Sequence, residues 1–119
     1  MATEMAINIS EEGRVVLVTF TSATIHNSDE INTAGEQIKD YINRKRPERM
    51  VFDFANVKFF SSQVLGLLLD IRSKLEEHNG SIVISSINPQ LHRVFRITNL
   101  NTVFKFFPDK NSAVKEGSS

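Results

Sequence analysis

The sequence predicts an α/β fold: one domain over residues 1–119, built on a mixed, mainly parallel sheet of four to five strands packed by about four helices. Three runs rich in β-branched and apolar residues predict strands: Arg14–Phe20, Arg49–Phe54 and Ser81–Ser86. Segments in which apolar residues recur at helical spacing separate and follow these runs. A strand–helix–strand alternation of this kind favours parallel strands joined by right-handed crossovers.

The N-terminal segment predicts an edge strand ahead of the first long one. Met5–Ile9 alternates weakly between apolar and polar residues, and Glu11–Gly13 predicts a turn. Arg14–Phe20 then predicts a strand, and Thr21–Asn27 predicts a polar connection to the first helix.

The first helix is predicted to begin at Ser28, a residue type favoured as an N-cap. Asp29 and Glu30 follow in the first turn, where acidic residues suit the helix dipole. Pro47 is expected to stop the helix. The residues at helical spacing are Ile31, Ala34, Ile38, Tyr41 and Ile42.

The second helix is predicted to follow the strand Arg49–Phe54 and a connection over Ala55–Phe60. It is expected to begin at Ser61 or Ser62 and to end near His78, before an Asn-Gly stop signal. The residues expected along one side of it are Leu65, Leu68, Leu69, Arg72 and Leu75.

The C-terminal part predicts a short helix, a short strand and a last helical turn. Asn88 is an expected N-cap and Pro89 an expected first helical residue. Val103–Phe107 predicts the strand, Ser112–Lys115 the turn, and residues 113–119 are expected to be a frayed tail. The residues expected on the apolar side of the short helix are Leu91, Val94, Phe95 and Ile97.

Composition excludes several classes of function. The 14 basic residues balance 14 acidic ones, so no overall field draws the chain to nucleic acid. No apolar run reaches the ~18 residues that a membrane span requires, and the first ten residues lack the pattern of a signal peptide. We therefore expect a cytoplasmic protein without a membrane span. Cysteine is absent, which excludes thiol chemistry.

Enzymatic patterns are weak, and we expect no catalytic residue, cofactor or metal. The five glycines are scattered and form no phosphate-binding loop. No histidine has metal-ligand spacing with another histidine or an acid on the same predicted helix. A triad of Ser62, His26 and Asp53 can be drawn on paper, but triads are defined by geometry. Asp53 is instead expected to support the neighbouring loop.

The serine pair Ser61-Ser62 lies at a junction of strand, loop and helix, and it permits two interpretations. Free N–H groups and the helix dipole favour a phosphate at a helix start, where it would add about −2 charge. Alternatively, the serines are N-caps and nothing more. Residue types alone favour the capping interpretation, because serine is a preferred N-cap.

The stretch from Phe52 to Phe107 resembles the STAS family, the anti-sigma factor antagonists and their relatives. The order and spacing of several short motifs carry the resemblance. These are the strand exit Asp53–Val57, the serine pair followed by Leu65-Gly66, the Asn79-Gly80 turn, the Asn88-Pro89 helix start and the ending Val94–Leu100. The first half of the chain matches only in the order of its elements.

The resemblance implies a phosphorylatable switch. In this family a partner anti-sigma kinase phosphorylates a helix-start serine, and a cognate serine phosphatase reverses the modification. Alignment on Leu65-Gly66 places Ser62 at the acceptor position, with Ser61 as the less favoured choice. Ser61 stands where the family commonly has Asp, and Val64 stands where it has Gly.

The resemblance also implies a docking surface, formed by the loop Asn56–Ser62 and one face of the following helix. Ile71 and Lys74 are expected on its solvent side with Val64 and Leu67, and one of the two adjacent phenylalanines is expected to face outward. Gly66 and Asp53 are expected to support the structure, and the protein is expected to be a monomer or weak dimer. The expected partner-binding residues are Thr24, His26, Phe59, Phe60, Ser61, Ser62, Gln63, Val64 and Leu67.

A second function class stays open at this point. STAS domains also serve as parts of signalling assemblies and of lipid-transport complexes, which implies a binding or scaffold subunit without phosphorylation. The departures at Ser61 and Val64 favour this alternative.

Overall fold

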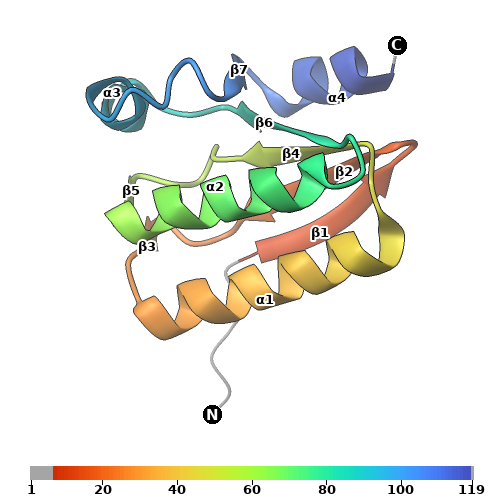
Figure 1. The fold of residues 1–119 in the computed structure, drawn as a ribbon. Helices are drawn as coiled ribbons and strands as arrows, with labels where there is room; N and C mark the ends of the chain where they lie inside the picture. The colour runs from red at the N-terminus through yellow and green to blue at the C-terminus, as the bar shows by residue number, and fades with distance from the viewer. Residues whose placement is uncertain (1–6, 119) are drawn as a thin grey trace.

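The computed structural model describes residues 7–118, which form a layered α/β body of helices packed on a β-sheet (Figure 1). The five-stranded sheet has the order β1-β2-β4-β6-β7, with β1 antiparallel to β2 and the other neighbours parallel. This confirms the predicted fold class. In chain order the elements are β1 (Ile7–Glu12), β2 (Val15–Phe20), β3 (Thr24–Ile25), α1 (Ser28–Lys45), β4 (Arg49–Asp53), β5 (Phe59–Phe60), α2 (Ser62–Glu76), β6 (Ser81–Ser85), α3 (Pro89–Ile97), β7 (Lys105–Phe107) and α4 (Lys110–Ser118).

Both faces of the five-stranded sheet are covered. Successive side chains of a strand point to opposite faces, so Met50 and Phe52 of β4 join one core cluster while Val51 joins another. The helices α1 and α2 cover the larger cluster, and α4 covers the smaller one from the opposite side (Figure 1). Because β4 is central and buried on both faces, its sequence is an almost continuous apolar run.

The first strand is longer than predicted. β1 continues to Glu12 and pairs with β2 as far as Val15, so the turn is moved to Gly13. Gly13 has a φ of +68°, a left-handed conformation that glycine adopts without steric cost. The predicted strand began at Met5, which lies outside the described residues.

Two helix starts are capped by asparagine side chains. The Asn27 side chain accepts a hydrogen bond from the Glu30 backbone N–H at 3.0 Å, so Asn27 and not Ser28 is the N-cap of α1. The expected cap of α3 is confirmed, because the Asn88 side chain accepts from the Leu91 N–H at 2.9 Å. Both asparagines satisfy N–H groups that have no partner inside the helix.

Two predicted helix faces each contain a residue that the structure exposes. Leu69 of α2 is 36% exposed and Ile97 of α3 is 73% exposed, so the expectation that both lie on the apolar side is wrong. Leu69 lies at the margin of the apolar stripe of α2, whereas Ile97 lies on the side of α3 that faces away from the buried Leu91 and Phe95.

The predicted helical turn over Ser112–Lys115 is confirmed, but it belongs to a longer helix that occupies most of the expected frayed tail, of which Ser119 lies outside the described residues. α4 runs from Lys110 to Ser118, and its Ala113 is fully buried against the sheet. Asp109 precedes the helix and its carboxylate accepts from the Ser112 N–H at 2.7 Å. That hydrogen bond holds the pKa of Asp109 below its ordinary value.

Candidate functional site

A two-stranded parallel sheet fixes the start of α2. In it β3 pairs with β5, joining Thr24 to Phe59 and Ile25 to Phe60. The Ser61 backbone N–H continues the ladder by donating to the carbonyl of Ile25 at 2.9 Å. The sequence predicts both segments as connections, because two residues are too few to show a strand periodicity.

The two serines at this junction have different environments. Ser61 is the N-cap residue of α2, with φ −80° and ψ 162°, but its side chain makes no capping hydrogen bond. The Ser61 Oγ is buried and has no hydrogen-bond partner among the described residues. Ser62, the first helical residue, is exposed. One interpretation of the serine pair was that the serines cap the helix. The Ser61 side chain makes no such hydrogen bond to α2.

The two adjacent phenylalanines face opposite ways. Phe59 is 53% exposed, whereas Phe60 is 5% exposed and contacts the rings of Phe54 and Phe95 with centroids 5.7 and 6.0 Å away. The expectation that one of the two faces outward is confirmed, and the outward one is Phe59. Phe60 belongs to the core and has no surface to offer a partner.

Three helix residues expected on the solvent side lie in the core instead. Val64 and Ile71 are fully buried, and Leu67 is buried as well. The reason is that α2 is enclosed by the sheet on one side and by α1 on another, so its core-facing surface is wider than one apolar stripe. Lys74 is half-buried, in an ion pair with Glu77 at 3.6 Å.

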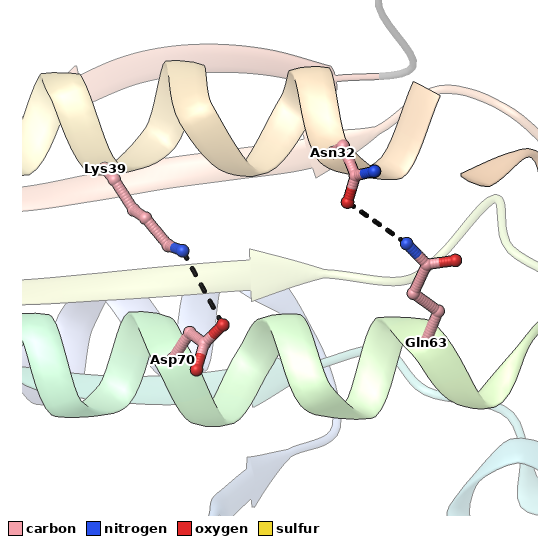
Figure 2. Close-up of polar contacts among 4 residues, drawn as sticks. All are labelled: Asn32, Lys39, Gln63 and Asp70. Carbon is pink, nitrogen blue, oxygen red and sulfur yellow. Dashed lines mark hydrogen bonds and ion pairs between the residues drawn. The ribbon is translucent and has the colours of Figure 1, made fainter. Parts of the chain in front are cut away.

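Gln63 connects the starts of the two helices. Its Oε1 accepts from the Ser28 hydroxyl at 3.0 Å, and its Nε2 donates to the Asn32 Oδ1 at 3.2 Å (Figure 2). The residue after Ser62 is therefore tied to the first turn of α1. Gln63 is one of the predicted partner-binding residues. Its partner Asn32 could not be predicted from the sequence, because it is one polar residue among many on a solvated helix face.

A groove of about 520 Å³ runs along the surface where α1 and α2 meet. Figure 2 shows the polar pairs that bridge it: Asn32 with Gln63 at one end, and Lys39 Nζ with Asp70 Oδ2 at 3.6 Å further along. The residues that line the groove are Ile31, Asn32, Gly35, Glu36, Lys39, Gln63, Gly66, Leu67 and Asp70.

Asp53 has a structural partner rather than a place in a triad. It is 4% exposed, and its Oδ1 accepts from the Ser85 hydroxyl at 2.8 Å on the adjacent strand. Thr24 and His26 are exposed, on and just after β3. Among residues 7–118, no group of three or more His, Asp or Glu side chains is placed to hold a metal ion.

No close packing requires glycine at position 66. A Cβ there would meet no atom within 4 Å, whereas a Cβ on Gly35 would lie 2.7 Å from the Leu67 Cδ1. The expected structural role therefore fits Gly35, which sequence analysis did not single out.

Gly66→Ala is accordingly expected to raise the free energy of unfolding by about 0.5–1 kcal/mol, because alanine favours the helix interior. Urea unfolding of both variants measures this. Gly35→Ala is the control, and its gain is expected to be offset because Leu67 must move. A destabilised Gly66→Ala would contradict this account.

The comparisons with known proteins agree with this architecture. A family model for the STAS domain matches residues 6–113. The chain belongs to the STAS domain family. No helix in the described part of this STAS domain is both long and apolar enough to cross a membrane.

Relatives of this STAS domain include an anti-sigma F factor antagonist of Paenibacillus polymyxa, 25% identical over 108 residues that cover 89% of this chain and 90% of the relative. The anti-sigma factor antagonist SpoIIAA in its unphosphorylated form has a similar structure, with a TM-score of 0.85, 17% identity and coverage of 95% and 96%. The STAS domain of a SulP transporter from Vibrio cholerae shares the fold at a TM-score of 0.69, with 11% identity and coverage of 91% and 84%. The chain is thus a STAS domain that is similar to proteins named anti-sigma factor antagonists.

Proposed function

We propose that this STAS domain binds an anti-sigma kinase and that phosphorylation of Ser62 by that kinase switches the binding off. The observation that carries the proposal is the exposed Ser62 hydroxyl on the first turn of α2, next to the rigid β3–β5 pair. Ser61 is a poorer acceptor, because its Oγ is buried and out of reach of a kinase.

The docking surface in this proposal consists of the exposed side chains around Ser62. Phe59 offers the aromatic anchor, while Thr24, His26 and Gln63 surround the serine. Exposed aromatic residues are frequent anchors of protein interfaces. The buried residues Phe60, Val64 and Leu67 act indirectly, by holding this surface in place.

A phosphate on Ser62 is compatible with the folded domain but not with docking. The positive end of the α2 dipole favours an anion at the helix start, and the first turn of α2 contains no acidic residue that would repel it. Inside an interface, the same charge would be buried without a partner, which costs several kcal/mol. Phosphorylation therefore weakens binding of the kinase without unfolding the domain.

The proposal includes a phosphatase that restores Ser62, a cytoplasmic location and a monomer or weak dimer. It assigns no catalytic role to the domain itself, because the kinase supplies the phosphoryl transfer. The relative named as an anti-sigma F factor antagonist supports this assignment.

Intact mass spectrometry tests the proposal. The protein and a Ser62→Ala control are incubated with ATP and each anti-sigma kinase of the source organism. We expect one added phosphoryl group on the wild type and none on the control. Failure of every kinase to modify the wild type would contradict the switch.

A second candidate function is a scaffold subunit that is not phosphorylated. The fold shared with the SulP transporter domain favours it, as does the Ser61-Ser62 pair in place of the family's usual Asp-Ser. Stable binding to another protein, unchanged in Ser62→Asp, would support this alternative.

A further inference from the structure

The outer face of α3 exposes an aliphatic side chain beside two cations. Leu91 and Phe95 point into the core, so the opposite side of the helix presents Arg93, Arg96 and Ile97 to solvent. These three residues are spaced i, i+3 and i+4, which places them together on one helix face. Ile97, at 73% exposure, is the most exposed large hydrophobic residue of the described chain.

The charge on this face has no counterpart nearby in the sequence. Between Glu77 and Asp109 the chain contains no acidic residue. No ion pair within residues 7–118 involves Arg93 or Arg96, whereas other arginines, such as Arg44, pair with a carboxylate on their own helix. The face therefore combines two cations with an exposed apolar side chain, and the cations have no ion-pair partner among the described residues.

Helix α3 is attached to the segment that leads to Ser62. In Figure 1, α3 lies at the same end of the molecule as β5 and the starts of α1 and α2. Two contacts attach it there: the Phe95 ring lies 6.0 Å from the Phe60 ring, and the Asn88 amide donates to the Val57 carbonyl at 3.2 Å. α3 and the start of α2 are therefore both available to one partner at this end of the molecule.

We infer that the face formed by Arg93, Arg96 and Ile97 is a second contact surface for the anti-sigma kinase, and that it receives an acidic segment of that kinase with an apolar recess for Ile97. The inference rests on the proposed function. Carboxylates of the partner would pair with the two guanidinium groups, and burial of Ile97 would remove its exposed apolar surface from water. Paired charges of this kind mainly set partner choice and association rate.

The experiment measures the dissociation constant of the kinase for four forms of the full chain: wild type, Ile97→Ser, Arg93→Glu and Lys45→Glu. Lys45 is an exposed cation at the far end of α1, so Lys45→Glu is the matched control for the charge change. We expect about tenfold weaker binding for Ile97→Ser and for Arg93→Glu, and no change for the control. The loss in Arg93→Glu is expected to shrink at high salt.

The outcomes separate this inference from the proposed function. Circular dichroism first establishes that each variant is folded, which the exposure of Ile97 and Arg93 favours. If the kinase does not bind wild type, both proposals are overturned. If Ser62→Asp abolishes binding while Ile97→Ser and Arg93→Glu bind like wild type, only the α3 surface is overturned. Binding of this face to anionic phosphatidylglycerol vesicles, with unchanged kinase affinity, would also overturn it and assign the face to a membrane.

Discussion

Ser62→Asp is expected to weaken kinase binding by about 100-fold or more while leaving the domain at least as stable as wild type. An uncompensated charge buried in an interface costs several kcal/mol, and each 1.4 kcal/mol changes the dissociation constant tenfold. The same carboxylate lies at the positive end of the α2 dipole, where acidic residues stabilise a helix by about 0.3–1 kcal/mol. Binding and stability are thus expected to change in opposite directions.

Calorimetric titration and urea unfolding measure the two quantities on the same samples. Ser73→Asp is the matched control, because Ser73 is also an exposed serine of α2, about 16 Å further along nearly the same helix face. We expect wild-type affinity for this control. Equal losses in both variants would point to a general charge effect on α2, and no loss in either would reject the switch.

Phe60→Ala is expected to lower the free energy of unfolding by about 3–4 kcal/mol, the usual cost of removing a buried aromatic ring. Phe60 is 5% exposed and connects Phe54 of the sheet exit to Phe95 of α3. Its loss removes the packing that joins the β5 loop to α3. Chemical unfolding monitored by circular dichroism measures the change.

Phe59→Ala is the complementary variant, because the Phe59 side chain faces solvent whereas the Phe60 side chain is buried. Its effect on unfolding is expected to stay within about 0.5 kcal/mol, as for most surface substitutions. Its kinase affinity is expected to fall about tenfold, since an exposed aromatic anchor is removed. Similar stability losses in Phe59→Ala and Phe60→Ala would contradict the opposite orientations.

The main sheet could be predicted from sequence because its central strands are buried on both faces. Such strands are recognisable as unbroken apolar runs, and β4 is the clearest example. The β3–β5 pair could not be predicted in this way, since each strand has only two residues and their pairing joins segments 35 positions apart. The pair is defined by hydrogen bonds between segments distant in the sequence, and a local residue pattern does not reveal it.

The start of α2 at Ser61-Ser62 was predicted correctly, but the solvent-exposed face of that helix was not. Apolar residues occur around most of α2, so the sequence alone could not say whether Val64 and Leu67 face solvent or core. The contact with α1 decides this, because Leu67 lies against Gly35 of that helix. Ile97 shows the reverse error, since an aliphatic residue at helical spacing was assigned to a core that ends one turn earlier.

In the β3–β5 ladder, the atoms that hold Ser62 in position are different from the side chains that are exposed around it. The ladder holds Ser61, and with it the start of α2, through backbone atoms only. The exposed side chains on it, at Thr24 and Phe59, are therefore free to change without displacing the serine. Under the proposed function, copies of such a gene can therefore diverge to recognise different kinases while Ser62 keeps its place, so that parallel signalling routes in one cell remain separate from each other.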